Sequence, residues 1–196
     1  MPLILASGSP RRLQLLQALD LEPVVVSPDI DETPLPDEEA ASHVERLARA
    51  KCAAVIERLE IDPGGDDPTI VIAADTIVCL DGELLGKPVD RRHAARDLRR
   101  LSGRSHEVMT GIAVSVDGTV RSAVERTAVT MAELTDEEID WYVATGEPDD
   151  KAGSYAMQGR GGVFVTTISG SYDNVLGLPR HRLTLLLAEL GQRLQG

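Results

Sequence analysis

The chain has 196 residues, enough for one sizeable core or two small lobes, and we expect residues 1–196 to form one domain. Its formal net charge is −12, because 32 Asp and Glu residues outnumber 20 Lys and Arg residues. This acidic balance argues against long-range attraction to a nucleic acid polymer or to an anionic membrane. An anionic partner must therefore be held by a local basic cluster or a bridging cation, which favours a small phosphorylated ligand.

The cysteines and the apolar segments indicate the cellular compartment. Cys52 and Cys79 are the only cysteines, and they are not spaced as a C-x-x-C pair. The chain does not start with a basic and then apolar signal segment, and no uninterrupted apolar stretch approaches about 18 residues. We therefore expect a soluble cytoplasmic protein in which both thiols are reduced and structural.

The apolar period switches repeatedly between two and about 3.6 residues, which predicts an α/β or mixed α+β fold. In chain order, the expected elements are a strand at 3–6, a helix at 10–19, a strand at 24–26, a helix at 37–59, turn formers at 62–68, a strand at 69–80, a helix at 90–101, a hairpin of strands at 106–116 and 120–132, a helix at 135–145, a strand at 163–168 and a helix from about 179. Thr135 and Glu138 form a capping-box pattern. His106 lies in an alternating strand and is expected to face solvent.

The turn after the first strand suggests a phosphate site. Pro10 suits the first helical position because that position does not need its N–H. Free amides, the hydroxyls of Ser7 and Ser9 and the positive end of the helix dipole would converge there. Arg11 or Arg12 could add planar donors that match phosphate oxygens. The alternative is an ordinary strand-to-helix turn with solvated arginines.

Three charged residues stand where the pattern favours burial or close backbone approach. Asp75 interrupts the apolar run at 70–78, so its carboxylate must meet a cation, a metal or a substrate. Lys51 falls on the apolar stripe of its helix, and Lys87 follows Gly86 in a loop. The alternatives are a structural arginine partner or a bulge for Asp75, and solvated side chains for Lys51 and Lys87.

An acid and two bases in such positions suit the hydrolysis of a phosphate ester. A water that attacks phosphorus needs a base to take its proton and cations to neutralise the oxygens. Asp75 could be that base, but a free aspartate with a pKa of about 3.9 is a weak one. Either its environment raises this pKa or a metal makes the water more acidic. The loop with Asp29, Asp31 and Glu32 offers oxygen ligands for Mg²⁺, or it is a solvated acidic edge.

These residues resemble the Maf family of nucleotide pyrophosphatases, also called septum-formation inhibitors, over the whole chain. The matching stretches are residues 5–12, 31–33, 46–51, 74–78, 86–88, 101–103 and 175–179. The resemblance implies a two-lobed, ITPase-like fold around an elongated mixed sheet with a deep central cleft. It also implies hydrolysis of a nucleoside triphosphate to the monophosphate and pyrophosphate with a divalent metal, Mg²⁺ or Mn²⁺. Asp75 would be the proton acceptor and, with Glu32, a metal ligand.

Residues 151–162 resemble the branch of the family that acts on dTTP and UTP, in which Gln158 and Thr76 would help to choose the base. An amide can both donate and accept, as the uracil or thymine edge requires. The branch that acts on 7-methyl-GTP carries an Arg-Asp-Pro-Asn run where this chain has Ser-Tyr-Asp-Asn at 171–174. Met157 departs from the isoleucine expected in the pyrimidine branch, and the glycine-rich segment alone could be a flexible loop.

We therefore expect a hydrolase that acts on dTTP and UTP, with modified pyrimidine triphosphates as further candidates. The predicted substrate-binding residues are Ser7, Ser9, Arg11, Arg12, Lys51, Thr76, Lys87 and Gln158. Two alternatives stay open: a 7-methyl-GTP pyrophosphatase of the same family, and a nucleotide-binding regulator of cell division that does not hydrolyse its ligand. The expected partner is a small nucleoside triphosphate, and the chain could form a homodimer.

Overall fold

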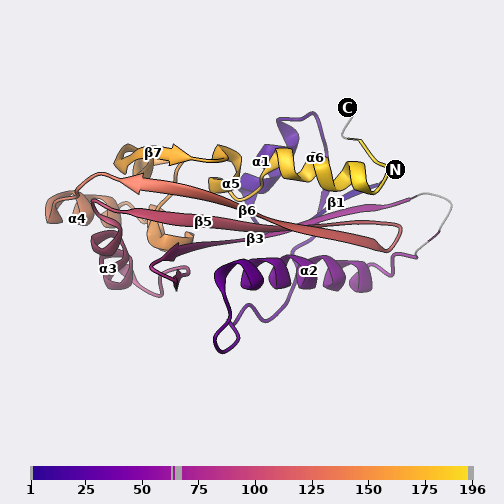
Figure 1. The fold of residues 1–196 in the computed structure, drawn as a ribbon, viewed down its shortest axis with the longest axis horizontal. Coiled ribbons are helices and arrows are strands. Elements are labelled where there is room, and N and C mark those ends of the chain that lie inside the picture. Colours follow the sequence, from indigo (N-terminus) through magenta and orange to yellow (C-terminus); the bar gives the residue numbers. More distant parts are fainter. Residues whose placement is uncertain (1, 63, 65–67, 194–196) are drawn as a thin grey trace.

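A seven-stranded mixed sheet forms the centre of the computed structural model, which describes residues 2–62, 64 and 68–193. The strands run in the order β2-β1-β3-β5-β6-β7, and β4 pairs with β3. The strands are β1 (Leu3–Ala6), β2 (Val24–Val25), β3 (Ile70–Leu80), β4 (Glu83–Leu85), β5 (Ser105–Val116), β6 (Thr119–Met131) and β7 (Val165–Ser169). β1 is parallel to β2 and β3, and the other pairings are antiparallel, which confirms the expected mixed sheet (Figure 1).

In the part of the chain that the structure describes, six α-helices surround this sheet. They are α1 (Pro10–Gln17), α2 (Ala40–Arg58), α3 (Arg91–Leu101), α4 (Asp136–Ala144), α5 (Tyr172–Val175) and α6 (Arg180–Glu189). Short 3₁₀ helices lie at Glu147–Asp150, Ala152–Ser154 and Arg160–Phe164. In the described ranges, no helix has the length and apolar character needed to cross a membrane.

The order of strands and helices follows the sequence-based expectation, with differences at a few boundaries. α2 begins at Ala40, because Asp37 has φ 55°, which is incompatible with a right-handed helix. β7 begins at Val165, because the residues before it form a 3₁₀ helix. The short α5 was not expected, since it is not long enough to show a period. Residues 63 and 65–67 of the expected turn at 62–68 lie outside the described residues.

β3 extends through two hydrophobic clusters on the same face of the sheet. Ile70 and Ile72 belong to one cluster, with residues of β1, α1 and α6. Val78 and Leu80 belong to another, with residues of α3 and α4. Thr76 lies on this face between the two clusters, and the opposite face of β3 packs against α2. The expected division of residues 1–196 into two lobes of one domain stays a prediction.

The pairing of β3 is interrupted on one side. β1 pairs with residues 70–73 of β3 and β4 with residues 78–80, whereas β5 pairs with its other side from residue 70 to residue 79. Among the described strands, residues 74–77 therefore have a partner on one side only. Because successive side chains point to opposite faces, this gap gives access to both faces of the sheet, at Asp75 and at Thr76.

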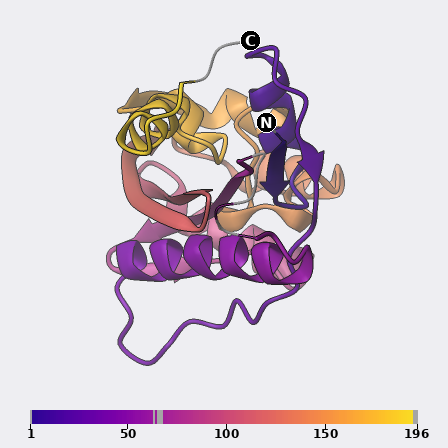
Figure 2. The same cartoon turned by 90° about the vertical axis from the view of Figure 1, so that its right-hand side faces the viewer.

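α2 lies directly against the sheet (Figures 1 and 2). The close approach depends on Gly111 of β5, where a Cβ atom would lie 2.2 Å from the carbonyl oxygen of Val44 in α2. Gly111 is also the register partner of Asp75 in β3. The helix backbone therefore approaches the sheet beside the strand position that carries the predicted catalytic carboxylate.

The prediction that His106 faces solvent is wrong. The strand does alternate, but His106 lies on the covered face together with Val108 and is only 3% exposed. Its Nε2 atom lies 2.8 Å from the hydroxyl oxygen of Tyr155. Burial lowers the pKa of His106 from 6.5 to about 4, so the imidazole is neutral at neutral pH.

This burial predicts a contribution of His106 to acid sensitivity. Between pH 6.5 and about 4 the unfolded state binds a proton at His106 that the folded state does not, so stability falls as the pH falls through this window. The full contribution is about 3 kcal/mol. In urea unfolding across this range, His106→Gln should flatten the pH dependence relative to the unmodified chain. Equal slopes for the two proteins would contradict the assignment.

Candidate active site

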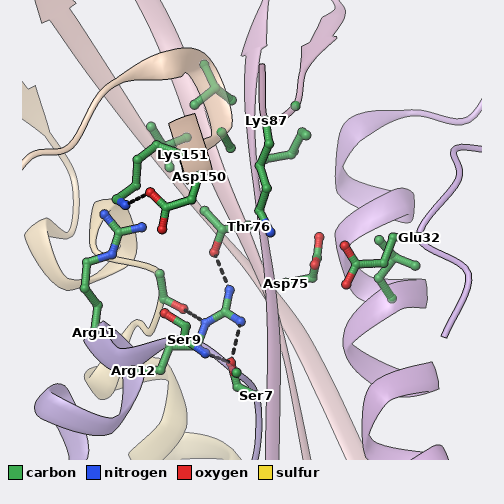
Figure 3. A pocket seen from close by; sticks show the side chains of 18 of the residues that line it. Ser7, Ser9, Arg11, Arg12, Glu32, Asp75, Thr76, Lys87, Asp150 and Lys151 are labelled. Atoms are coloured by element: carbon green, nitrogen blue, oxygen red, sulfur yellow. Dashed lines mark hydrogen bonds and ion pairs between the residues drawn. The ribbon is translucent and has the colours of Figure 1, made fainter. Parts of the chain in front are cut away.

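A cavity of about 780 Å³ opens at the gap in β3 (Figure 3). It is lined by the turn after β1, the loop before α2, α2 itself, β3, the loop after β4 and the segment around Lys151. The predicted site residues that it brings together are Ser7, Ser9, Arg11, Arg12, Glu32, Lys51, Asp75, Thr76 and Lys87. Residues of five separate sequence motifs thus meet in one cleft, and Gln158 is the predicted residue that does not line it.

Lys51 and Asp75 form a buried ion pair in this cleft. The Lys51 Nζ atom lies 2.6 Å from Asp75 Oδ1, and the two residues are 7% and 8% exposed. The partner of Asp75 is therefore a lysine of α2, and the pairing of β3 with β5 is regular through Asp75, without a bulge. Removing the Lys51 charge would leave the Asp75 carboxylate buried without its paired cation.

Glu32 completes a group of three charges. Its Oε1 atom lies 2.6 Å from the same Lys51 Nζ atom, so the two carboxylates converge on one ammonium group. Burial acts to raise the pKa of Glu32. The hydrogen bond from Lys51 and the charges of Lys51, Lys87 and Arg12 outweigh burial and lower this pKa below its usual range. Glu32 is therefore ionised at neutral pH.

Arg12 is held in the cleft wall by three hydrogen bonds. Its Nε atom donates to the carbonyl oxygen of Gly177 at 2.8 Å, Nη1 to the hydroxyl of Ser7 at 3.0 Å, and Nη2 to the hydroxyl of Thr76 at 3.0 Å. Burial lowers the pKa of Arg12, but a guanidinium stays charged in proteins. Each terminal nitrogen keeps one N–H that these bonds do not use, so Arg12 is a fixed cation with donors left for a ligand.

Thr76 fixes Arg12 through a chain of buried hydrogen bonds. Its hydroxyl lies 2.9 Å from that of Thr110, which lies 3.1 Å from the carbonyl oxygen of Asn174. Since Thr110 donates to Asn174, Thr76 donates to Thr110 and accepts from Arg12. The Asn174 amide in turn donates to the Val108 carbonyl and the Thr127 hydroxyl, both at 2.9 Å. The Arg12 position is therefore tied to β3, β5, β6 and α5.

Arg11, Asp150 and Lys151 form the opposite wall, across from Asp75 and Glu32 (Figure 3). Lys151 pairs with Asp150. Burial lowers the pKa of Arg11, and the charge of Asp150 opposes this effect. Sequence reasoning did not assign Lys151 or Asp150 to the site. The sequence feature that could have identified these two residues is their position at the start of the glycine-rich segment.

Gln158 lies in a second hollow of about 250 Å³. Arg11 and Lys151 line both this hollow and the main cleft, so the two adjoin. The glycine-rich segment beside Gln158 is held by Glu147, whose carboxylate accepts hydrogen bonds from the amides of Arg160 and Gly161, both at 3.0 Å. These bonds give the segment a defined backbone path.

The chain is similar to known proteins over nearly its whole length. A family model described as Maf-like protein matches residues 2–190. The chain belongs to the Maf family. It is 49% identical over 189 residues to a protein of Symbiobacterium thermophilum named dTTP/UTP pyrophosphatase, covering 96% of this chain and 94% of the relative. A protein of the same name from Anaeromyxobacter dehalogenans is 50% identical over 193 residues, covering 96% of this chain and 94% of the relative.

A third relative, from Dechloromonas aromatica and also named dTTP/UTP pyrophosphatase, is 45% identical over 201 residues and covers 98% of this Maf chain and 99% of its own length. A solved structure of the Ham1 protein of Staphylococcus aureus matches 97% of this chain and 98% of its own, with 18% identity and a TM-score of 0.49. That likeness is distant and adds nothing to the family assignment.

Asp75 and Glu32 are the residues of this Maf chain that could hold a divalent cation. Asp75 and Glu32 lie side by side because both contact the Lys51 ammonium, and Mg²⁺ is commonly held by one or two carboxylates together with phosphate oxygens and waters. No group of three or more His, Cys, Asp or Glu side chains suited to a metal occurs in the described ranges.

The buried ion pair generates a prediction about stability. Lys51→Met should lower the free energy of unfolding by about 3–5 kcal/mol, because it leaves the Asp75 charge unpaired. The double variant Lys51→Met/Asp75→Asn should recover a large part of this loss in urea titrations. Arg104→Met is the matched control, since the Arg104–Asp81 pair has the same 2.6 Å separation but is exposed. It should cost no more than about 1 kcal/mol. Equal losses for the Lys51 and Arg104 variants would contradict the prediction.

Proposed function

We propose that this chain hydrolyses dTTP and UTP to the nucleoside monophosphate and pyrophosphate. Three relatives that match nearly the whole chain are named for action on these two nucleotides. The observation that carries the proposal is the Asp75 carboxylate, which is buried at the open edge of β3, is paired with the Lys51 ammonium and shares its cleft with Arg11, Arg12, Lys87 and Lys151. Two buried, free cysteines are consistent with the proposed cytoplasmic location.

The triphosphate would be bound by the cations of both cleft walls. Arg12 has donors left after its three internal hydrogen bonds, while Arg11, Lys87 and Lys151 line the same space. The hydroxyl of Ser9 does not cap α1, so it is also available to a phosphate oxygen. The first amides of a helix lack intrahelical partners, which adds backbone donors at the start of α1. These groups neutralise the phosphates and hold them for in-line attack.

Asp75 would accept the proton of the attacking water. Its Oδ1 atom is held by Lys51 at 2.6 Å, and Oδ2 has no hydrogen-bond partner within the described part of the chain. Lys51 therefore orients the carboxylate while one oxygen stays available as a base. Hydrolysis to the monophosphate breaks the bond between the α-phosphorus and the bridging oxygen, and the cations stabilise the charge of the departing pyrophosphate.

A divalent cation is part of this proposal. Asp75 and Glu32 would hold Mg²⁺ or Mn²⁺ together with phosphate oxygens. When bound, the cation would neutralise phosphate charge and make a water easier to deprotonate, which an aspartate base requires. Lys51 would then serve to space the two carboxylates, with which it forms hydrogen-bond-length contacts in this structure.

Pyrophosphate release from a panel of triphosphates tests the proposed function. With Mg²⁺ or Mn²⁺, dTTP and UTP should react fastest. Asp75→Asn should lower kcat about 10²- to 10⁴-fold while calorimetry still detects nucleotide binding. Asp140→Asn, an exposed change on α4, should leave kcat unchanged. Faster release from 7-methyl-GTP would assign the chain to the other branch, and binding without release would favour the non-hydrolytic regulator.

The base preference predicted for Gln158 has its own test. If the base extends past Arg11 and Lys151 into the second hollow, the Gln158 amide can pair with the uracil or thymine edge. Gln158→Ala should then lower kcat/KM for dTTP and UTP about 10- to 100-fold and for purine triphosphates much less. Gln17→Ala, an exposed change on α1, is the control. Equal losses for all nucleotides would contradict a role in base selection.

A further inference from the structure

The loop that carries Glu32 has no helix or strand of its own. It joins β2 to α2 over residues 26–39 and passes beside α2 as a long trace (Figure 2). The Glu32 side chain is 51% exposed, and its ion-pair partner within the described residues is Lys51. Burial therefore does little to fix this carboxylate. Its position beside Lys51 and Asp75 depends on what holds the loop.

Glu38, near the end of this loop, is a partly buried residue whose carboxylate has several partners. Arg46 of α2 donates to it twice, from Nε to Oε1 at 2.6 Å and from Nη2 to Oε2 at 2.7 Å. The Nδ1 atom of His43 lies 2.9 Å from Oε2, and the amide of Leu35 donates to Oε2 at 3.0 Å. The Glu38 side chain is 7% exposed. The hydrogen bonds from Arg46 lower the pKa of Glu38, so this carboxylate is charged.

The same contacts extend to the neighbour of Glu32. Nη2 of Arg46 donates to the carbonyl oxygen of Thr33 at 3.3 Å, and the amide of Thr33 donates to Asp31 Oδ1 at 2.9 Å. Glu38 and Arg46 therefore attach the loop to α2 at Leu35 and at Thr33. The second attachment is one residue from Glu32, while Lys51 lies on the same helix as Arg46.

We propose that Glu38 is a positioning residue for Glu32. By joining the loop to Arg46 and His43 of α2, it holds the Glu32 carboxylate at hydrogen-bond distance from Lys51 and next to Asp75. Glu38 does not line the cleft, so it acts through Glu32 and not on the substrate. The inference rests on the part that the proposed function gives to Glu32 in holding a divalent cation.

A purely structural ion pair would have different consequences. Glu38 could simply stabilise the start of α2, and its loss would then lower stability without changing how activity depends on the cation. If Glu38 instead positions Glu32, removing Glu38 should change the cation dependence of activity only when Glu32 is present. A double-mutant cycle separates the two, because independent effects add and effects that pass through one group do not.

The experiment compares Glu38→Gln, Glu32→Gln and the double variant, with the Mn²⁺ dependence of dTTP hydrolysis as one readout. Glu38→Gln should raise the half-saturating Mn²⁺ concentration about tenfold or more, as removal of a group that orients a metal ligand does. In the Glu32→Gln background it should change this concentration less than twofold. Glu39→Gln is the matched control, since Glu39 is the exposed neighbour and its side chain does not cap α2.

Hydrogen exchange without metal or nucleotide gives a second, independent readout. In Glu38→Gln, the amides of residues 31–36 should exchange at least tenfold faster, whereas those in the middle of α2 should keep their protection. If Glu38→Gln does not fold, Arg46→Lys removes the two-point hydrogen bonding while keeping the charge, and the same results are expected.

Three results would overturn the inference: additive effects of Glu38→Gln and Glu32→Gln, unchanged exchange in residues 31–36, or a Mn²⁺ dependence that Glu38→Gln leaves unaltered. Failure of the proposed function has a different signature. If the unmodified chain releases no pyrophosphate, or if Glu32→Gln leaves the Mn²⁺ dependence unchanged, the assigned reaction or the assigned role of Glu32 is wrong. The exchange experiment still reports in those cases whether Glu38 holds the loop.

Discussion

The buried ion pair between Lys51 and Asp75 is the interaction on which the site depends. A carboxylate on an interior strand is costly unless a cation lies within hydrogen-bond distance, and here that cation comes from α2. The helix approaches closely enough because Gly111, the register partner of Asp75, has no side chain to push it away. The geometry of the proposed base thus follows from a glycine on the neighbouring strand and a lysine on the covering helix.

The other cleft charges are also held from within the fold. Arg12 is fixed by the Ser7 hydroxyl, the Thr76 hydroxyl and the Gly177 carbonyl, and the threonines behind it connect three strands. Groups that are already oriented need little reorganisation when charge develops on a substrate, which is the basis of electrostatic stabilisation in enzymes. The hydrogen-bonded side chains of Thr76 and Thr110 behind Arg12 are therefore part of the site as well as part of the core.

The sequence predicts the elements whose signals are local. Asp75 and Lys51 are visible as charges within apolar patterns, and the capping box at Thr135 forms as expected. What it cannot show are contacts between distant segments, such as the bond from Arg12 to Gly177, which are 165 positions apart. The error at His106 has the same origin, because alternation identifies two faces of a strand but not which of them the rest of the chain will cover.

The interrupted pairing of β3 has a consequence for association between chains. A strand edge with free N–H and C=O groups is a template on which another chain can add a strand, and proteins usually protect such edges. Here the unpaired stretch covers only residues 74–77 and lies at the base of a charged cleft between β1 and β4. Residues 74–77 can thus keep backbone groups open to a small ligand while forming too short an edge for another chain to add a strand there.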